Sequence, residues 1–217
     1  MPTRLLERIC YYKQRQMIYD IGFLIGERGN MSVQIERRYF TVDEYSRMSE
    51  AGIFSPDDRV ELIEGEIIKM SPIGSPHAAC VDRIVNTSLV QLAGRGVIIR
   101  VQSPIILDDY SEPQPDITLL RSRPDFYAQG HPKPADVLLL IEVADSSVDI
   151  DRDVKLPLYA QSGIPEVVIV ALPEEVVGFH AEPISGQYQR VEILRRGDYL
   201  ESVIIPKFRL NVNDILG

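Results

Sequence analysis

The sequence predicts an α/β fold in which a mixed central β-sheet is flanked by helices. An apolar run, residues 137–141, lies between Pro134 and Ser146-Ser147, and such a run is typical of a strand that is buried on both faces. Segments with helical and strand patterns follow one another in the order helix, strands, helix, strands, which favours a sheet covered on both sides. The chain has 217 residues, 45% of them hydrophobic, enough for one main domain with one core.

The first predicted elements after residue 40 are a short helix and a β-hairpin. Thr41 and Glu44 have the spacing of a capping box, and the helix that they open is expected to end at Gly52. Residues 59–70 are predicted to form two β-segments that are joined by a turn at Glu64-Gly65.

A longer helix and two strand regions come next. Ser75 and Pro76 are expected to cap and start the helix, which has an apolar face and ends at Gly94. Residues 97–109 predict a long strand, or a pair of strands interrupted by a proline. Residues 115–120 predict another strand.

The second half of the chain begins with a proline-rich loop, residues 123–136, that leads into the buried strand. A helix is predicted from about Asp151 to Gly163, with Pro157 kinking or tightening its early turns. Asp151 and Asp153 are expected to cap the start of this helix and to favour its dipole. Four further β-segments and a short last turn are predicted at residues 167–172, 176–180, 186–194, 200–205 and 211–216.

Residues 1–34 differ from the rest of the chain. Basic residues are followed there by a short apolar patch and a glycine-containing polar stretch, without the small-residue cleavage site of a secretory signal. From Met31 onward the sequence is typical of a domain opening. We therefore expect residues 1–34 to be a weakly ordered extension and residues 35–217 to form the domain.

Charge and cysteine content limit the classes of function. The formal net charge of −9 and the pI near 4.9 argue against a protein that coats nucleic acid non-specifically. Carboxylates that hold divalent cations count as negative in this sum, so a metal-dependent nuclease is not excluded. Cys10 and Cys80 are too few for a disulfide framework or a Cys-based zinc site, which favours a reducing, cytoplasmic location. No apolar stretch of the sequence reaches the length that crosses a bilayer, so we expect no membrane segment.

Three residues predict a metal-dependent site at the sheet. Glu142 ends the buried strand and loses hydration there, so it requires a compensating cation. Asp116 enters the candidate neighbouring strand; if the two strands pair, the carboxylates converge, and Mg²⁺ or Mn²⁺ would relieve their repulsion. Lys155, on the following helix, could bring an ammonium group to stabilise developing negative charge. This is the minimal equipment of a metal-dependent phosphodiesterase.

Three motifs occur in the order that is known from one protein family. They are PQPD at residues 113–116, IEVADSS at residues 141–147 and DRDVKLPLYAQSGIPE at residues 151–166. With them the chain resembles the Uma family of bacterial restriction endonucleases, within the PD-(D/E)XK nuclease superfamily, over roughly residues 38–216. The resemblance implies a restriction-endonuclease-like core with additional β-segments, and an activity on DNA.

The resemblance also implies a role for each residue of the site. Asp116 and Glu142 become metal ligands, with the main-chain carbonyl of Val143 as a further ligand. In the common superfamily pattern the lysine lies two residues after the acid on the same strand, where this chain has Ala144. The resemblance implies that Lys155 fills this vacant space from the helix and acts as the catalytic amine.

Three further residues are candidates for supporting roles. His77 could approach the site or bond to the scissile phosphate, although surface capping is the simpler interpretation. Tyr159 lies one turn after Lys155 and could support the lysine or a phosphate oxygen. Glu61 lies in a β-segment and could be an accessory ligand. The sequence has no G-x-S-x-G, P-loop or G-x-G-x-x-G motif, which argues against serine hydrolysis and nucleotide-cofactor chemistry.

These observations predict a metal-dependent endonuclease that hydrolyses DNA phosphodiester bonds and uses Mg²⁺ or Mn²⁺. The alternative is a catalytically inactive protein of the nuclease fold that acts in binding or assembly. The acidity of the chain, and the absence of a basic sequence patch with interleaved aromatic residues, favour that alternative. A homodimer is expected by analogy, because many such nucleases cut both strands with two subunits.

Overall fold

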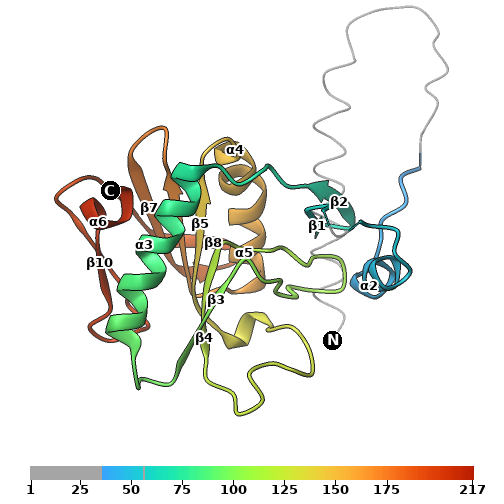
Figure 1. The fold of residues 1–217 in the computed structure, drawn as a ribbon, viewed down its shortest axis with the longest axis horizontal. Coiled ribbons are helices and arrows are strands. Elements are labelled where there is room, and N and C mark those ends of the chain that lie inside the picture. The colour runs from blue at the N-terminus through green and yellow to red at the C-terminus, as the bar shows by residue number, and fades with distance from the viewer. Residues whose placement is uncertain (1–35, 56) are drawn as a thin grey trace, which may run out of the picture. The chain divides into compact units, whose positions relative to one another are not determined.

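A six-stranded mixed β-sheet forms the centre of the protein, whose residues 36–55 and 57–217 are described by a computed structural model (Figure 1). The strands are β3 (Val97–Val101), β4 (Ile117–Arg121), β5 (Val137–Ala144), β6 (Glu166–Ala171), β7 (Val176–Ile184) and β8 (Gln187–Leu194), and they lie in this order across the sheet. Only β5 and β6 run parallel; the other neighbouring strands of this sheet are antiparallel. The predicted mixed sheet is confirmed.

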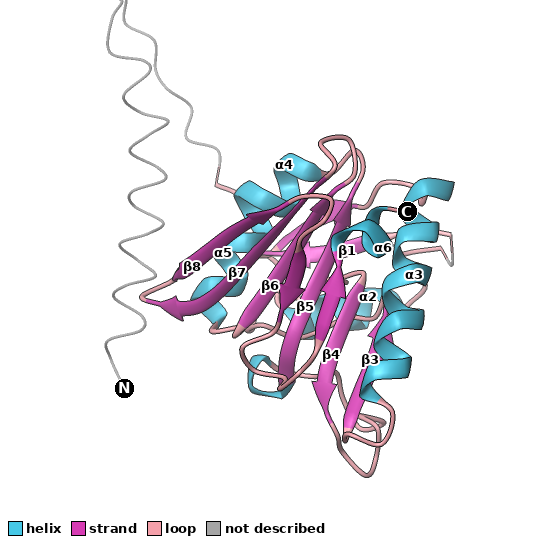
Figure 2. Cartoon of the chain, turned by 90° about the vertical axis from the view of Figure 1, so that its left-hand side faces the viewer, coloured by secondary structure: helices cyan, strands magenta, loops and turns pink. Residues whose placement is uncertain are grey.

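Helices cover both faces of this sheet, as Figure 2 shows. The helices are α2 (Val42–Glu50), α3 (Ser75–Leu92), the one-turn η1 (Pro134–Asp136), α4 (Val148–Ile150), η2 (Asp151–Lys155), α5 (Leu156–Ser162) and α6 (Val212–Leu216). Ile84 of α3 and Ile215 of α6 belong to one apolar cluster, and Leu158 of α5 belongs to a second. The two clusters are the cores on the two faces, and both include residues of β5.

All eight residues of β5 are buried, as the apolar run predicted. Ile141 and Val143 pack into the core under α3, while Leu140 and Ala144 pack into the core under α5. This alternation of side chains places Glu142 on the α5 side of the sheet, at the end where β5 stops. A strand that is buried along its whole length therefore carries the acid that the sequence singles out.

The predicted capping box and hairpin are both present before the main sheet. The amide of Glu44 donates to the Thr41 hydroxyl, and the Thr41 amide donates to the Glu44 carboxylate. The hairpin consists of β1 (Val60–Ile63) and β2 (Glu66–Lys69). Its turn residues Glu64 and Gly65 have φ of 50° and 82°, the left-handed conformation that two-residue hairpin turns require.

Two predicted β-regions are longer than the strands that form. In residues 97–109 only β3 is a strand, and it ends before Gln102, which has the left-handed φ of 45°. Pro104, which cannot donate to a ladder, follows in the irregular part. In residues 200–205 only the first two belong to a strand, β9 (Tyr199–Glu201), which pairs with β10 (Arg209–Asn211) in a separate small sheet. The amides of Val203 and Ile204 donate instead to the buried carboxylate of Glu166.

The helix boundaries also differ from the expectation in two places. Ser75 does not cap α3; Gly74 precedes the helix and makes no side-chain bond to it. The helical region after β5 begins at Val148, earlier than expected, and ends as predicted at Gly163, which has the left-handed φ of 78°. Its middle part, η2, is a π-helical turn in which the Leu156 amide donates to the Asp151 carbonyl.

The proline after η2 gives the physical reason for the wide turn. Pro157 has no amide hydrogen, so it cannot donate to the carbonyl four residues earlier, where an α-helix would need it. The π turn leaves both Asp151 and Lys155 buried. The expectation that Asp151 caps the helix is therefore wrong: Ser147 occupies the cap position, and the Asp151 side chain is buried near the sheet.

The predicted extension, residues 1–34, lies outside the described residues, so the domain boundary near residue 35 stays a prediction. Residues 38–217 form one compact unit. No helix in the described part of the chain is both long enough and apolar enough to cross a membrane.

Candidate active site

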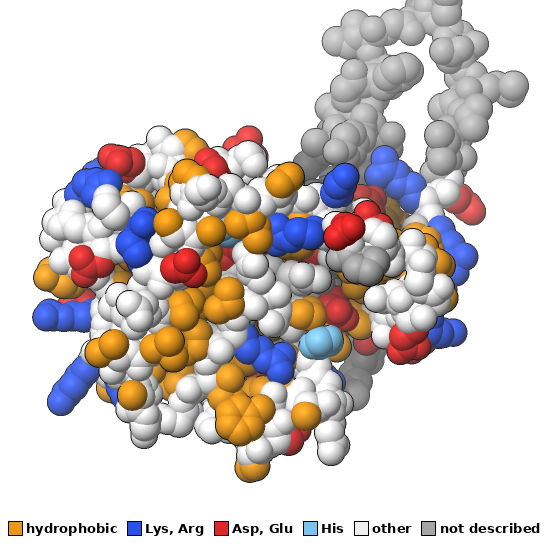
Figure 3. All heavy atoms as spheres, in the orientation of Figure 1, with side chains coloured by type: hydrophobic (Ala, Val, Ile, Leu, Met, Phe, Trp, Pro, Cys, Tyr) orange, Lys and Arg blue, Asp and Glu red, His pale blue; other side chains and the backbone are white. Residues whose placement is uncertain are grey.

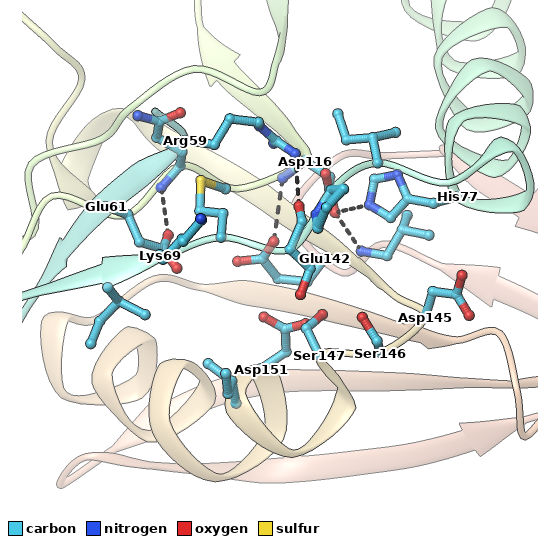
Figure 4. A pocket seen from close by; sticks show the side chains of 18 of the residues that line it. Arg59, Glu61, Lys69, His77, Asp116, Glu142, Asp145, Ser146, Ser147 and Asp151 are labelled. Carbon is cyan, nitrogen blue, oxygen red and sulfur yellow. Dashed lines mark hydrogen bonds and ion pairs between the residues drawn. The ribbon is translucent and has the colours of Figure 1, made fainter. Parts of the chain in front are cut away.

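Asp116 and Glu142 lie side by side where β4 begins and β5 ends (Figure 4). Ile117 pairs with Ile141 in the antiparallel ladder, so the residues just beyond this pair meet. The Val143 amide donates to Asp116 Oδ2 over 2.9 Å, and the Asp116 amide donates to Glu142 Oε2 over 3.3 Å. The two predicted acids are thus brought together through backbone amides rather than through a direct contact of their carboxyl groups.

Lys155 reaches the same place from η2. Its Nζ lies 2.9 Å from Glu61 Oε1, 3.4 Å from Glu142 Oε1 and 3.5 Å from Asp151 Oδ1, and all of these side chains are buried. Burial alone would lower the pKa of Lys155, but the carboxylates of Glu142, Glu61 and Asp151 raise it above its ordinary value. The ammonium form of Lys155 is therefore maintained inside the protein.

Glu142 is the most strongly desolvated acid of the site. Burial raises its pKa to about 8, Lys155 acts in the opposite direction, and the nearby carboxylates of Asp151 and Asp116 reinforce the rise. The Tyr159 hydroxyl donates to Glu142 Oε1 over 2.6 Å. Lys155 was one of the two expected partners of Tyr159, but Tyr159 contacts Glu142 instead.

His77 reaches Asp116 from the first turn of α3. Its Nε2 lies 3.0 Å from Asp116 Oδ2, and this hydrogen bond raises the pKa of His77 above its ordinary value, although burial opposes the rise. On the other side, Gln102 Nε2 donates to Asp116 Oδ1 over 3.2 Å. The Asp116 carboxylate is therefore held in place from three directions, by Val143, His77 and Gln102.

The sequence did not predict that Asp151 and Gln102 lie at the site, and it predicted Glu61 only as an accessory ligand. Glu61 makes the shortest ion pair with Lys155, and its other oxygen accepts the Gln114 amide over 3.1 Å. Asp151 accepts from the Ser147 hydroxyl over 2.7 Å, and burial raises its pKa. One signal was available: Asp151 precedes Lys155 by four residues, the spacing of a helical ion pair.

A cavity of about 90 Å³ opens directly above these side chains. Its floor is formed by the acids and Lys155, and its rim includes two cations from the hairpin region, Arg59 and Lys69. Asp145 and Ser146, just after β5, also line it (Figure 4). Since a cavity of about 10–15 Å³ on this measure holds one water, this one has room for an ion with a few waters.

The donor set suits a hard divalent cation. Asp116 and Glu142 supply carboxylate oxygens that retain free lone pairs beside the hydrogen bonds they accept. No group of three Asp, Glu, His or Cys side chains among the described residues is arranged to hold one ion. Mg²⁺ commonly uses one or two carboxylates and keeps several waters, so two acids beside an open cavity fit it.

Comparisons with known proteins agree with this fold. A crystal structure from Anabaena variabilis ATCC 29413, described as "a putative nuclease belonging to DUF820", is similar to this chain with a TM-score of 0.63 and 15% sequence identity. The similarity covers 82% of this chain and 97% of that one, and at this identity it shows the common fold. No curated protein matches the chain in sequence.

One family model matches most of the chain. It is the Uma2 model, described as "Putative restriction endonuclease", and it covers residues 42–213. The matched range begins at α2, ends in α6 and includes every residue of the site. The chain therefore belongs to the Uma2 family, as the motifs around Asp116, Glu142 and Lys155 had indicated.

Proposed function

We propose that this protein is a metal-dependent endonuclease that hydrolyses phosphodiester bonds of DNA, with Mg²⁺ or Mn²⁺ as its cofactor. The observation that carries the proposal is a buried cluster of acids around a single lysine at the end of the central sheet. The cluster consists of Glu61, Asp116, Glu142, Asp151 and Lys155. Its excess negative charge is what a divalent cation would offset.

Asp116, Glu142 and the main-chain carbonyl of Val143 are the proposed ligands of the cation. The first two are adjacent at the cavity floor, and Val143 follows Glu142 directly on β5. When bound there, the cation would supply Lewis acidity to a phosphate group and to an attacking water. His77 would act as a positioning residue, since its contact with Asp116 fixes the orientation of that carboxylate.

Lys155 is the proposed catalytic amine. Its ion pairs with Glu61 and Asp151 keep the side chain protonated. The ammonium group therefore lines the cavity beside Glu142, where it would contact a bound phosphate. A preorganised cation in a water-poor site stabilises negative charge that develops on phosphate oxygens. Tyr159 would keep the Glu142 carboxyl group in place through its 2.6 Å hydrogen bond.

DNA is the proposed substrate because two basic side chains stand at the rim of the cavity, above a floor in which acids outnumber Lys155. Arg59 and Lys69 both line the opening, and Arg59 also donates to the Ser71 carbonyl, which fixes its position. Basic side chains at such a place bind phosphates on either side of a scissile bond. The family description as a restriction endonuclease supports the same substrate class.

Nicking of supercoiled plasmid DNA tests this proposal. We expect the full chain to convert supercoiled plasmid to open circles with Mg²⁺ or Mn²⁺, and not with excess chelator. Lys155→Ala and Asp116→Ala should each lower the rate by about 100-fold or more, as loss of one transition-state contact does. Lys133→Ala, at an exposed position outside the cavity, is the matched control and should retain the wild-type rate.

Two outcomes would count against an endonuclease. One is nicking that persists in Asp116→Ala and Lys155→Ala, because the activity would then come from elsewhere. The other is the absence of any metal-dependent nicking by the folded wild-type chain on plasmid or on single-stranded DNA.

The second candidate function is a catalytically inactive member of the fold that acts in binding or assembly. The observation that favours it is the closed set of contacts around Lys155, which has three acidic partners before any substrate arrives. In that case the folded wild-type chain would bind DNA or Mn²⁺ without cutting the DNA.

A further inference from the structure

Strand β8 is an open edge of the central sheet. It is the last strand in the sheet order, with β7 on one side and no described strand on the other (Figure 2). Its eight residues contain no Pro, and its two charged side chains, Arg190 and Glu192, have opposite signs. The strand at the opposite edge, β3, is shorter, with five residues. A long edge of this kind is expected to pair with another strand.

The side chains of β8 divide into two different rows. Val191 and Ile193 lie in one row and are 54% and 58% exposed, although both are large and aliphatic. They share the sheet face of α5, because their partners Gly178 and His180 alternate with the α3-side residue Phe179. This row is an uncovered apolar strip beside the free edge.

The other row of β8 carries two opposite charges at neighbouring positions. Arg190 Nε donates to Glu192 Oε1 over 2.6 Å within the same strand, and both side chains are partly exposed. The two residues stand symmetrically on either side of Val191. A strand with this arrangement is complementary to a second copy of itself that runs in the opposite direction.

We propose that two copies of this chain pair through β8, antiparallel, about a twofold axis that passes through Val191. In this register Arg190 of each copy faces Glu192 of the other, and Val191 faces Val191. A register centred on Arg190 or on Glu192 would place like charges directly opposite each other, which destabilises a strand pair. The charges therefore select one register out of the neighbouring ones.

The same register also accounts for the apolar strip. Residues directly opposite in an antiparallel pair have Cβ atoms about 4.5–5.5 Å apart, and diagonal neighbours remain within reach of each other. Val191 of the two copies would be in contact, and Ile193 of each copy would lie diagonal to Val191 of the other. Main-chain hydrogen bonds between the edges would supply affinity, as in other cases of strand addition. Because it uses an edge strand far along the sheet from β4 and β5, this interface does not depend on the proposed endonuclease activity.

Light scattering on the full chain, over about a hundredfold range of protein concentration, tests the pairing. We expect wild-type dimers that dissociate on dilution. Val191→Lys should shift the mass to that of the monomer, since it places two ammonium groups opposite each other at the axis. Val90→Lys on α3, where the wild-type side chain is 78% exposed, is the matched control and should remain dimeric.

Two charge variants test the register itself. Arg190→Glu gives a β8 with two acids and Glu192→Arg gives one with two bases, so each variant alone should be monomeric. When the two variants are mixed, every cross-strand pair again joins opposite charges, and a heterodimer should form. Effects of either substitution inside one chain are the same before and after mixing, so recovery on mixing reports the interface alone.

The proposal is overturned by any of three results. These are a wild-type chain that is monomeric at every concentration, a dimer that Val191→Lys leaves intact, and charge variants that stay separate on mixing. Loss of plasmid nicking, with the dimer retained, would bear on the proposed function and not on this interface.

Discussion

Lys155 offsets only part of the negative charge that surrounds it. It contacts Glu61, Glu142 and Asp151, and Asp116 lies on the far side of Glu142. A buried acid whose charge is not fully neutralised by nearby cations binds a proton or a metal ion. Burial raises the pKa of Glu142 to about 8, so without a metal ion this acid holds a proton at neutral pH. The arrangement is therefore one in which a divalent ion would replace a proton.

The sequence predicted some of these residues because their evidence is local. Asp116 and Glu142 stand beside apolar runs that must be strands, and an acid at such a place is rare without a reason. Asp151 was misplaced because a polar residue near a helix start normally caps it, and no sequence pattern reveals a π turn. The role of Glu61 depends on its ion pair with Lys155, which lies 94 positions later in the chain (155 − 61). Strand patterns in the sequence carry no information on such a contact.

Glu112 gives a prediction that is independent of the metal. Burial raises its pKa to about 7, from an ordinary value of 4.5. Between these pH values the folded chain keeps a proton that the unfolded chain has released, so the Glu112 contribution to the free energy of unfolding falls as pH rises and levels off above pH 7. We expect Glu112→Gln to be more stable than wild type at pH 8 by about 2 kcal/mol, and nearly equal to it at pH 4.5.

Urea unfolding at both pH values measures the difference, with Glu50→Gln at an exposed position of α2 as the control. A Glu112→Gln variant that is less stable than wild type at pH 8 would contradict the account, because the carboxylate would then be making a stabilising contact.

At the scale of elements, the strands and helices with a strong pattern were predictable and their ends were less so. β5 was predictable because the apolar run at residues 137–141, bounded by Pro134 and Ser146-Ser147, is typical of a buried strand. The early end of β9 was not, because the amides that would have extended it bond to the Glu166 side chain of a distant strand. Tertiary hydrogen bonds of this kind override a local preference for strand.

The β1–β2 hairpin shows how one turn supports the site. Gly65 has φ of 82°, and a Cβ added to it would lie 2.6 Å from the Cβ of Tyr39. Gly163, which ends α5 with φ of 78°, has no atom within 4 Å of such a Cβ. We therefore expect Gly65→Ala to cost about 3 kcal/mol and Gly163→Ala about 1 kcal/mol, since only the first adds a clash to the backbone strain.

Thermal unfolding of the two glycine variants checks this order, and Gly65→Ala should also reduce nicking because β1 carries Glu61. Equal losses of stability for Gly65→Ala and Gly163→Ala would show that the hairpin turn is not closely packed against Tyr39.

At the scale of the whole molecule, a net charge of −9 opposes the approach of DNA. The face drawn in Figure 3 carries Lys and Arg side chains interspersed with Asp and Glu, without one large basic area. Binding should then depend on a few phosphate contacts at the rim of the cavity. The fold class was predictable from composition and pattern, but this distribution of charge was not, since it depends on where the elements place each side chain.

The salt dependence of DNA binding measures those contacts. Ca²⁺ replaces Mg²⁺ to suppress cutting. The logarithm of the affinity falls as the logarithm of the salt concentration rises, and we expect Arg59→Ala and Lys69→Ala each to make this slope less steep by about 1. Arg195→Ala, exposed in the turn after β8, should leave the slope unchanged. Equal slopes for all of these chains would place the DNA on another surface.

The most direct test of the central claim is anomalous X-ray scattering from crystals of the protein soaked in Mn²⁺. We predict a peak between Asp116 and Glu142, with carboxylate oxygens of both residues at about 2.2 Å, and its loss in Asp116→Ala. A cavity that stays empty at saturating Mn²⁺, with Lys155 still bound by its three acids, would contradict the claim that this cluster is a metal-dependent active site.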